Sequence, residues 1–346
     1  MSSRKKVYVG ISGGVDSSVS ALTLKKEGFD VTGVFIKIWH PDFLQCNWKA
    51  EMRDAMRICA KLEISFKMLD LSETYKKEVM DYMIEEYRSG RTPNPDVMCN
   101  KFVKFGGFFD YAMNDGADFV ATGHYAQVKD GKMLKAVDQD KDQTYFLWTL
   151  KREHLLNTLF PIGNLKKEKV RKIAERNNLF TAEKKDSQGL CFVGHVDMKE
   201  FLKKYIETKK GNVLNSKGEV IGEHDGSVLY TIGERHGFLI TKKDTDEKPL
   251  YVISKNIKDN TITVSDSKIS NETSANQITV TSLNLNQENI EGELEARIRY
   301  RQPLQKVNLD AENKEVTFDK PQESISSGQS IVFYKNDECL GGAIIK

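Results

Sequence analysis

The segment from Lys6 to Gly28, KVYVGISGGVDSSVSALTLKKEG, decides the fold of this 346-residue chain. Val7, Val9 and Ile11 lie in an apolar run, which predicts a buried strand. The apolar residues that follow recur at helical spacing, and Gly28 is a typical helix stop. A strand, a glycine-rich turn and a helix in this order form the start of a βαβ unit.

The same alternation continues through the first third of the chain. Apolar strands are predicted at 31–39, 65–71 and 118–123, and helices are predicted around 52–60 and over 73–88. The apolar face of the 52–60 helix is predicted to contain Met52, Ala55, Met56, Cys59 and Ala60. Such alternation is typical of a doubly wound α/β fold with a parallel sheet, whose ligand binds beyond the carboxyl ends of the strands.

The second half of the chain has a different character. Residues 211–226 and 251–265 are predicted to form hairpins around the turns NSKG and KDN, and the C-terminal part contains short β patterns separated by polar turns. We therefore expect three domains. They are a doubly wound parallel-sheet domain over 1–209, a small β-rich central domain over 210–272 and a C-terminal β-barrel over 273–346.

Composition and charge exclude several classes of protein. Hydrophobic residues make up 39% of the chain and charged residues 29%, which is typical of a soluble globular protein, and no apolar run is long enough to span a membrane. The basic N-terminus passes directly into a strand pattern without the apolar core of a secretory signal, so we expect a cytoplasmic protein. Because the net charge is only +2, any contact with nucleic acid must come from local basic patches.

The turn at 10–18, GISGGVDSS, has the composition of a phosphate cradle. Its glycines let the backbone approach a ligand, its serines supply hydroxyl donors, and the amide end of the following helix favours negative charge. It lacks both the Gly-Lys-Ser/Thr ending of P-loop phosphoryl-transfer enzymes and the G-x-G-x-x-G of dinucleotide binders. The alternative is a plain tight turn in which Asp16 caps the helix. A second ligand-facing position is expected directly after Ala121, where another strand ends.

Five cysteines are present, widely spaced and without a C-x-x-C pair. This pattern argues against a secreted disulfide scaffold and against a structural zinc site. We expect Cys59 and Cys339 to be small buried residues, whereas the sequence leaves Cys46 undecided.

The other two cysteines lie in segments that are unsuited to a core. Cys99 follows two prolines in GRTPNPDVMCNK, on a stiff loop that precedes or starts a helix. The nearby Lys101 and Lys104 predict a lowered pKa and a partly ionised thiol. Cys191 lies in KKDSQGLCFVG, again between lysines and glycines, and only folding could bring the two cysteines together.

Several motifs, in order along the chain, carry a resemblance to a known family. S-G-G-V-D-S, between a predicted strand and a predicted helix, resembles the signature of the PP-loop ATP pyrophosphatases, which cleave ATP between the α and β phosphates and adenylate a substrate oxygen. GISGGVDSSVSA, GRTPNPDVMCNKFVKF, ATGHYA, KDQTYFLWTL, KKDSQGLCFVG, GQSIVFY and CLGGAII together resemble the bacterial and organellar tRNA 2-thiouridylases over essentially the whole chain.

The resemblance implies an activity and its partners. The reaction would be ATP-dependent replacement of the C2 oxygen of a tRNA uridine by sulfur, at the wobble position of tRNAs for Lys, Glu and Gln. The cofactors would be ATP and Mg²⁺. The partners would be tRNA and a persulfide donor, either a sulfur-relay protein or a cysteine desulfurase. An extruded uridine suits the rigid, proline-rich segment before Cys99.

The resemblance also assigns roles to individual residues. Cys99 matches the family's nucleophile, and Cys191 matches the cysteine that carries the persulfide. Asp96 is a candidate acid or base, and the alternative for it is a salt-bridge or capping role. The residues that match ATP-binding positions are Gly10, Ile11, Ser12, Gly13, Gly14, Val15, Asp16, Ser17, Ile36 and Gly123. The residues that match positions at the target base or the tRNA are Asn94, Pro95, Asp96, His124, Lys141, Asp142, Gln143, Arg299, Tyr300 and Gln329. For the triplet 141–143 the alternative is a solvated turn.

Several positions depart from the family's pattern. Ile232, Glu234 and His236 vary a tight T-x-G-x-R-x-G motif in the middle domain. Ile36 stands where the family usually has a methionine that contacts the adenine, and Glu63 replaces a common glycine. The change at Ile36 preserves an apolar surface, and none of these changes touches the two cysteine motifs.

Alternating arginines form a further candidate RNA contact. Arg297, Arg299 and Arg301 alternate with Ile298 and Tyr300, so a strand would place three guanidiniums on one face. Guanidiniums suit phosphate recognition, and a merely solvated face is the alternative.

Three alternative readings of the whole chain remain open. A PP-loop ligase acting on a small metabolite would explain the ATP loop but would leave both cysteine motifs without a role. A noncatalytic RNA-binding protein would leave both the glycine-rich loop and the cysteine motifs without a role. An iron–sulfur cluster held by Asp96, Cys99 and Cys191 could deliver sulfide, although the resemblance favours a persulfide.

Overall fold

The N-terminal strands form a five-stranded, wholly parallel sheet in the computed structural model, which describes residues 4–44, 48–185, 191, 197–241, 248–267, 275–287 and 293–346. The strand order is β3-β2-β1-β4-β7, which confirms the doubly wound fold. The strands are β1 (Lys6–Gly10), β2 (Asp30–Lys37), β3 (Ser65–Asp70), β4 (Phe119–Ala121) and β7 (Thr158–Leu159). Cys46 lies outside the described residues.

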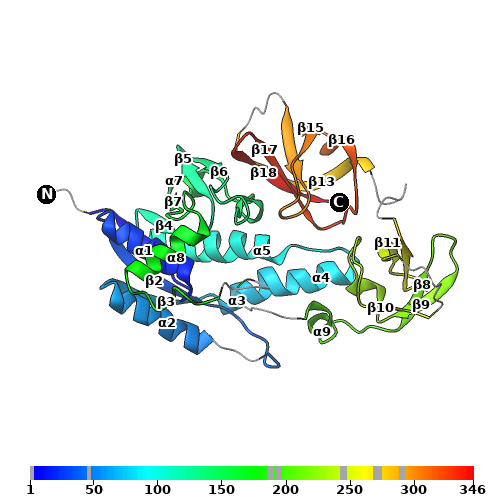
Figure 1. Ribbon diagram of the computed structural model, residues 1–346, viewed down its shortest axis with the longest axis horizontal. Helices are drawn as coiled ribbons and strands as arrows, with labels where there is room; N and C mark the ends of the chain where they lie inside the picture. Colours follow the sequence, from blue (N-terminus) through cyan, green and yellow to red (C-terminus); the bar gives the residue numbers. More distant parts are fainter. Residues whose placement is uncertain are drawn as a thin grey trace.

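Helices cover both faces of this sheet (Figure 1). One face packs against α1 (Val15–Lys26), α2 (Trp48–Lys61) and α8 (Lys167–Arg176), and α1 and α8 lie side by side. The other face packs against helices that include two π-helical segments. They are α3 (Ser72–Tyr75), η1 (Lys76–Asp81), α4 (Tyr82–Arg88), α5 (Pro95–Met98), η2 (Cys99–Gly107) and α6 (Phe108–Asn114). Among the described residues no helix is both long and apolar enough to cross a membrane.

The first two helices end in the same left-handed turn. Gly28 follows α1 with φ +90°, and its amide donates to the Lys25 carbonyl at 3.1 Å, which confirms the predicted stop. Glu63 follows α2 with φ +48°, and its amide donates to the Ala60 carbonyl at 3.0 Å. A side chain in this conformation costs roughly 1–2 kcal/mol that glycine avoids. The backbone thus explains why glycine is common at position 63 in the resembled family.

The predicted apolar face of α2 is wrong for two of its members. Met56 is 46% exposed and Ala60 is exposed as well. The buried residues of α2 are Ala55, Ile58 and Cys59. Because the sheet covers only a narrow stripe of this helix, residues one step round its circumference lie in solvent.

The second half of the chain forms the β structures that its sequence predicts. A five-stranded sheet of order β10-β9-β8-β12-β11 contains both predicted hairpins. Its strands are β8 (Gly211–Leu214), β9 (Val220–His224), β10 (Phe238–Ile240), β11 (Tyr251–Asn256) and β12 (Thr261–Ser265). The 3₁₀ turn η4 (Ser227–Leu229) follows β9, and the short helix α9 (Met198–Leu202) precedes this sheet.

Six antiparallel strands close the C-terminal barrel. Their order is β13-β16-β15-β14-β17-β18, and β13 pairs with β18 to complete the circle. The strands are β13 (Ala275–Leu285), β14 (Leu294–Arg297), β15 (Gln305–Asp310), β16 (Glu315–Gln322), β17 (Ser330–Lys335) and β18 (Glu338–Ile345).

A hairpin from the first half of the chain joins this barrel sheet. β5 (Gln127–Lys129) pairs with β6 (Lys132–Leu134), and β6 pairs with the start of β18. The hairpin is followed by η3 (Thr144–Phe146) and α7 (Arg152–Leu156), beside the barrel in Figure 1. The first half of the chain and the barrel therefore share one continuous sheet.

Candidate active site

The glycine-rich loop joins β1 to α1 at the carboxyl edge of the parallel sheet. Ser12 and Ser17 face each other across the loop with their Oγ atoms 3.3 Å apart, and the Gly14 amide donates to the Ser12 Oγ at 3.4 Å. Gly14 is the N-cap of α1, and no side chain caps the helix, so the alternative in which Asp16 is the cap is wrong. The first-turn amides and the two hydroxyls can therefore receive a phosphate.

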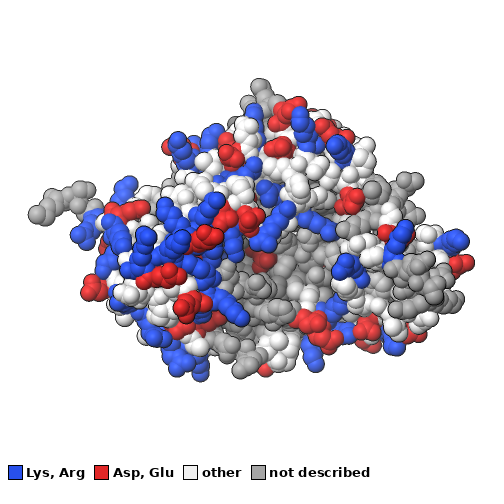
Figure 2. Space-filling view, in the orientation of Figure 1, with Lys and Arg blue, Asp and Glu red and all other residues white. Residues whose placement is uncertain are grey.

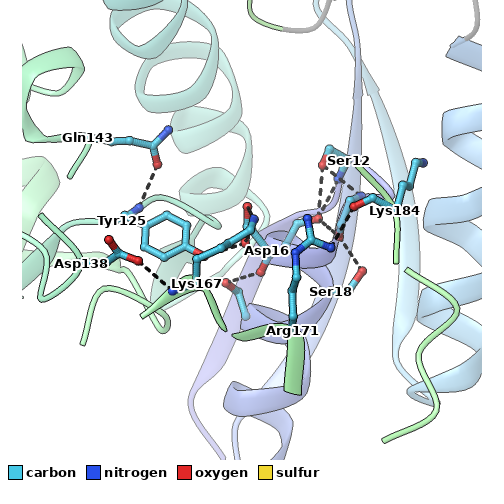
Figure 3. A network of polar contacts seen from close by, with 12 residues as sticks. Ser12, Asp16, Ser18, Tyr125, Asp138, Gln143, Lys167, Arg171 and Lys184 are labelled. Atoms are coloured by element: carbon cyan, nitrogen blue, oxygen red, sulfur yellow. Dashed lines mark hydrogen bonds and ion pairs between the residues drawn. The ribbon is translucent and has the colours of Figure 1, made fainter. Parts of the chain in front are cut away.

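Two lysines from later in the chain hold this loop (Figure 3). Lys167 donates from Nζ to both carboxylate oxygens of Asp16 at 2.8 Å, and the Tyr125 hydroxyl donates to the same carboxylate at 2.9 Å. Lys184 donates from Nζ to the Gly13 carbonyl at 3.0 Å and pairs with an aspartate of α2. These contacts place two cations beside the amide end of α1, where an anion is expected.

The end of β4 packs directly against the loop. A Cβ atom on Gly123 would lie 2.8 Å from the Ser17 amide nitrogen and 2.9 Å from the carbonyl carbon of Asp16, so the backbones meet there only because residue 123 is glycine. Ile36 lies near the carboxyl end of β2 and is buried. The predicted ATP positions thus gather around β1, at the point where the strand order reverses.

Two thiols that are 92 residues apart in sequence meet on the other side of β4. The Sγ atoms of Cys99 and Cys191 lie 3.3 Å apart. The Cys191 backbone is held at both ends, because its amide donates to the Asp96 Oδ1 at 3.1 Å and its carbonyl accepts from the Tyr75 hydroxyl at 3.0 Å. Both cysteines are free thiols. A disulfide has a sulfur separation of about 2.05 Å, so the two sulfur atoms are in contact but not bonded.

The stiff loop expected at Cys99 is wrong, although Cys99 does start a helical segment, η2. The helix begins earlier, at N-cap Asn94, whose side chain accepts from the Val97 amide at 3.3 Å, and Pro95 occupies the first helical position. Cys99 follows as the first residue of η2 and is completely buried. The prolines that exclude regular structure from a helix interior are compatible with a helix start.

The two thiols also ionise differently from the prediction. Burial and the hydrogen bond to Cys191 raise the pKa of Cys99 well above its ordinary value. The hydrogen bond from the Cys99 thiol lowers the pKa of Cys191, and Lys104 acts in the same direction against burial. Burial raises the pKa of Asp96 although the Cys191 amide and Lys104 oppose it. Of the two thiols, Cys191 therefore ionises more readily, and Cys99 donates to it.

A buried chain of polar groups connects the sulfur pair with the edge of the nucleotide loop. Lys104 Nζ lies 3.2 Å from His124 Nε2, and His124 Nδ1 lies 2.6 Å from the Thr122 Oγ1. Burial, and then the charge of Lys104, lower the pKa of His124 well below its ordinary value. The neutral ring accepts from the ammonium at Nε2 and so carries its proton on Nδ1. Thr122 and His124 flank Gly123, which touches the loop.

Comparison with known proteins identifies the family. Family models match residues 5–195 (tRNA methyl transferase HUP domain), 199–266 (tRNA methyl transferase PRC-barrel domain) and 275–345 (Aminomethyltransferase beta-barrel domain). The tRNA-specific 2-thiouridylase MnmA of Streptococcus thermophilus (strain CNRZ 1066) is 44% identical over 356 residues, which cover 99% of this chain and 95% of the relative. The tRNA-specific 2-thiouridylase MnmA of Francisella tularensis subsp. holarctica (strain FTNF002-00 / FTA) is 45% identical and covers 99% of both chains. The chain belongs to the tRNA-specific 2-thiouridylase family.

Similarity to solved structures is more remote. The U34-tRNA thiolase NcsA from Methanococcus maripaludis, with its 4Fe–4S cluster, is 18% identical and aligns with a TM-score of 0.37 over 59% of this chain and 67% of that one. A similarity at this level carries no functional argument. In the described part of this chain, no three His, Cys, Asp or Glu residues form a group that could hold a metal ion.

The segment that precedes α5 of this 2-thiouridylase is anchored by its barrel. The Gln329 Nε2 donates to the carbonyl of Thr92 at 2.9 Å and to that of Pro93 at 3.2 Å, and the Thr92 amide donates to the Ser327 carbonyl at 2.8 Å. The Thr92 hydroxyl lies 3.3 Å from that of Thr231 in the central region. All three regions therefore meet directly before Asn94, and the role of Gln329 at tRNA stays a prediction.

Within the triplet 141–143, Asp142 is 1% exposed, so the alternative of a solvated turn is wrong there. The Asp142 carboxylate accepts from the Ala136 amide at 3.1 Å and from the Thr144 hydroxyl at 2.9 Å, and it lies 3.8 Å from an Arg297 nitrogen. Gln143 accepts from the Tyr125 amide at 2.9 Å. Because the Asp142 carboxylate is occupied inside the protein, a tRNA contact at this residue would have to use its backbone.

The prediction of three guanidiniums on one strand face is wrong. β14 ends at Arg297, which is buried against the Tyr334 ring. Arg299 donates to the carbonyls of Ile232 and Ser324, both at 2.9 Å, and so joins the central region to the barrel. Arg301 is exposed, with φ +63°, above the ring of Tyr300. The chain turns after Arg297, so alternation no longer selects a face.

Basic side chains gather elsewhere on the surface. Figure 2 shows Lys and Arg over the region where Figure 1 places α1 and α8. The exposed basic residues of α8 include Lys169, Lys172 and Arg176. A local basic patch is thus present despite a net charge near zero.

His124 is only 6% exposed and lies against the rings of Phe105 and Phe160. The role of His124 at tRNA stays a prediction.

Sequence reasoning missed several residues of the site. Lys167 and Tyr75 lie outside every motif, and nothing near them in sequence reveals that they reach Asp16 and Cys191. Lys184 lies within a recognised motif, but its contact with the phosphate loop depends on tertiary structure.

Proposed function

We propose that this chain uses ATP to replace the C2 oxygen of the wobble uridine of tRNAs for Lys, Glu and Gln with sulfur. The observation that carries the proposal is the meeting of two thiols, 3.3 Å apart, which a chain of polar groups through Lys104 and His124 connects with the edge of the glycine-rich loop. A ligase for a small metabolite would need the loop but would leave this sulfur pair without a purpose. Membership of the 2-thiouridylase family supports the same substrate.

In this proposal the segment Gly10–Ser17, Ile36 and Gly123 bind ATP. The first-turn amides of α1 and the hydroxyls of Ser12 and Ser17 hold the pyrophosphate, and Lys167 and Lys184 compensate its charge. Mg²⁺ usually takes one or two protein carboxylates and completes its shell with phosphate oxygens and water, and Asp16 would have to leave its ion pair with Lys167 to serve as that carboxylate. The uridine C2 oxygen attacks the α phosphate and displaces pyrophosphate. The C2 oxygen then carries AMP, which makes it a good leaving group.

The two cysteines then perform different steps. Cys191, the more readily ionised thiol of the pair, takes sulfur from a persulfide donor such as a sulfur-relay protein or a cysteine desulfurase. Its persulfide supplies the sulfur to the activated uridine, directly or as sulfide released when Cys99 attacks it and forms a disulfide. Asp96 fixes the Cys191 backbone through the 3.1 Å hydrogen bond, and as a buried carboxyl it can also handle a proton.

The remaining assignments follow from the anchored catalytic segment. We propose that Asn94, Pro95 and Asp96 meet the extruded uridine, and that the barrel contributes Tyr300 and Gln329 to the tRNA interface. Lys141 and His124 belong to the same interface. The domain boundaries proposed are 1–209, 210–272 and 273–346, and the setting is the cytoplasm, where mature tRNA is used.

Thiolation in vitro tests this proposal. Purified protein, tRNA, ATP and a persulfide donor should yield 2-thiouridine, measured by mass spectrometry of the nucleosides, and omission of ATP should abolish it. Cys191→Ser should lose the enzyme-bound persulfide, whereas Cys99→Ser should keep that persulfide and fail to release its sulfur. Cys59→Ala, which alters a buried thiol of α2, is the matched control and should remain active.

Two outcomes would contradict the proposal. Full activity of either serine variant would remove that cysteine from the reaction, and a persulfide on Cys99 in place of Cys191 would reverse the roles. Anaerobic purification followed by iron analysis tests the cluster alternative, because stoichiometric iron that is required for thiolation would replace the persulfide route.

A further inference from the structure

Lys104 faces the sulfur pair because the helix that carries it is a π-helix. In η2 the hydrogen bonds run from residue i to i+5, so residue 104 lies above residue 99. In an α-helix the residues three and four positions along, Phe102 and Val103, would occupy that place. The wider turn therefore directs the ammonium toward the two sulfur atoms.

The charged surroundings of the sulfur pair are sparse. The titratable groups that face Cys191 are Tyr75 from α3, Asp96 from α5, and Cys99 and Lys104 from η2. Among the described residues that act on these two thiols and on Asp96, Lys104 is the cation. Its side chain hydrogen-bonds to the Cys191 sulfur and lies 3.2 Å from the His124 Nε2.

Lys104 keeps its charge in this buried setting. Burial lowers the pKa of its ammonium, but the two cysteines and Asp96 more than offset that effect, so the pKa is raised overall. His124 stays neutral and can only accept from the ammonium, which fixes the direction of the side chain. The ammonium is thus preorganised beside a sulfur atom that reacts.

We propose that Lys104 is a catalytic residue of sulfur transfer, whose ammonium holds the Cys191 sulfur in its anionic form both when the thiolate accepts sulfur and when the resulting persulfide delivers it. The inference rests on the proposed function. In the accepting step the Cys191 thiolate attacks the outer sulfur of a donor hydropersulfide, R–S–SH. The bond from Cys191 Sγ to that sulfur forms, the donor S–S bond breaks, and its electron pair leaves on the donor as R–S⁻. The proton stays on the transferred sulfur until it passes to water, which leaves a persulfide anion against Lys104.

Alkylation of the wild-type protein and of three variants tests this assignment. Trypsin separates the two cysteines, since Cys191 falls in the peptide 186–199 and Cys99 in the peptide 92–101, which becomes 92–104 when Lys101 is replaced. Iodoacetamide labelling of each peptide is measured by mass spectrometry across a pH series. The variants are Lys104→Met, which removes the charge at similar length, Lys104→Arg, which restores it, and Lys101→Met as a control on the exposed side of the same segment. The rate of persulfide formation on the 186–199 peptide is measured with glutathione persulfide as the donor.

Lys104→Met should alkylate Cys191 about tenfold more slowly at pH 7, with the midpoint of the profile displaced by about one pH unit to higher pH. Its rate of persulfide formation should fall by a similar factor, Lys104→Arg should recover most of both, and Lys101→Met should match the wild type. An unchanged profile in a folded Lys104→Met protein would overturn the assignment and leave Lys104 a packing role.

The wild-type protein provides a second measurement that does not depend on the folding of any variant. Cys191 should become alkylated at lower pH than Cys99, and the reverse order would overturn the proposal. The labelling experiments contain neither tRNA nor ATP. A wild-type protein that shows the expected labelling but no thiolation would therefore refute the proposed function while retaining the effect of Lys104 on the sulfur.

Discussion

Gly13 and Gly14 are neighbours in the phosphate loop, yet they should respond in opposite ways to one added methyl group. Gly13 has φ +73°, and a Cβ there would lie 2.9 Å from the Asp54 Cβ and 2.9 Å from the Glu51 carbonyl oxygen, both on α2. Gly14 has φ −94° in extended backbone, and its Cβ would meet the Ser12 Oγ at 3.3 Å. A methyl group at residue 13 would therefore clash with α2, whereas one at residue 14 would contact only the loop itself.

The magnitudes follow from these contacts. A left-handed backbone costs an L residue roughly 1–2 kcal/mol, and overpacking a filled site typically costs about 1–3 kcal/mol. Gly13→Ala is therefore expected to lower the free energy of unfolding by about 2–5 kcal/mol. Gly14→Ala should change it by less than about 1 kcal/mol, because alanine adopts extended backbone without strain and is only a slightly poorer N-cap. The methyl group of Gly14→Ala should lower ATP affinity at least about tenfold, or 1.4 kcal/mol, because it lies beside the Ser12 hydroxyl that is proposed to hold the phosphate.

Urea unfolding followed by tryptophan fluorescence, and calorimetric titration with ATP, measure the two quantities separately. Gly13→Ala should shift the unfolding midpoint, and Gly14→Ala should shift the dissociation constant. A Gly13→Ala protein as stable as the wild type would refute the steric argument. Wild-type ATP affinity in Gly14→Ala would place the phosphate outside the loop.

Four further substitutions probe the barrel, the end of α2 and the buried histidine. Arg301→Ala should weaken tRNA binding and reduce the slope of log affinity against log salt concentration by about one. Arg299→Ala should chiefly destabilise the junction between the central region and the barrel. Wild-type affinity and slope in Arg301→Ala would show that Arg301 is a solvated surface residue without a tRNA contact. Glu63→Gly should raise the free energy of unfolding in urea by about 0.5–1 kcal/mol through relief of its left-handed backbone, and a decrease would mean that its exposed ion pair with Lys25 outweighs the strain. His124→Gln tests pH dependence. The pKa of His124 in the folded protein lies below the unfolded value of about 6.5, so the wild type loses stability as the pH falls below that value. The difference in free energy of unfolding between wild type and variant should therefore narrow as the pH falls from about 7.5 to 5. A gap that stays constant with pH would show that this ring is not held neutral.

Local patterns in the sequence were sufficient to predict the strands and the phosphate loop. The apolar runs around Val7 and Val34 and the stop at Gly28 concern residues that are close in sequence, and each element formed where its pattern lies. Patterns that depend on what a neighbour covers were less reliable. Met56 has the helical spacing of a buried residue, but the sheet does not extend far enough to cover it.

The chemistry of the site depends on contacts between distant segments, which explains why its charges were predicted less well. A thiol beside two lysines in sequence suggested an ionised Cys99, but burial of that thiol and its donation to Cys191 raise the pKa of Cys99 and lower that of Cys191. Arg299 and Arg301 lost their common face because the strand ends before them. The order of the motifs was visible in the sequence; the partners of each side chain required the fold.

The strand that closes the barrel also completes a sheet that begins in the nucleotide-binding region, since Cys339 of β18 pairs with Met133 of β6. A gene fragment that starts at residue 273 would produce a barrel with part of this strand unpaired, and a fragment that stops at 209 would leave the hairpin 127–134 with an open edge. Unpaired edges of this kind promote aggregation. An exchange of barrels between relatives, made to alter the choice of tRNA, therefore has to transfer that hairpin together with the barrel.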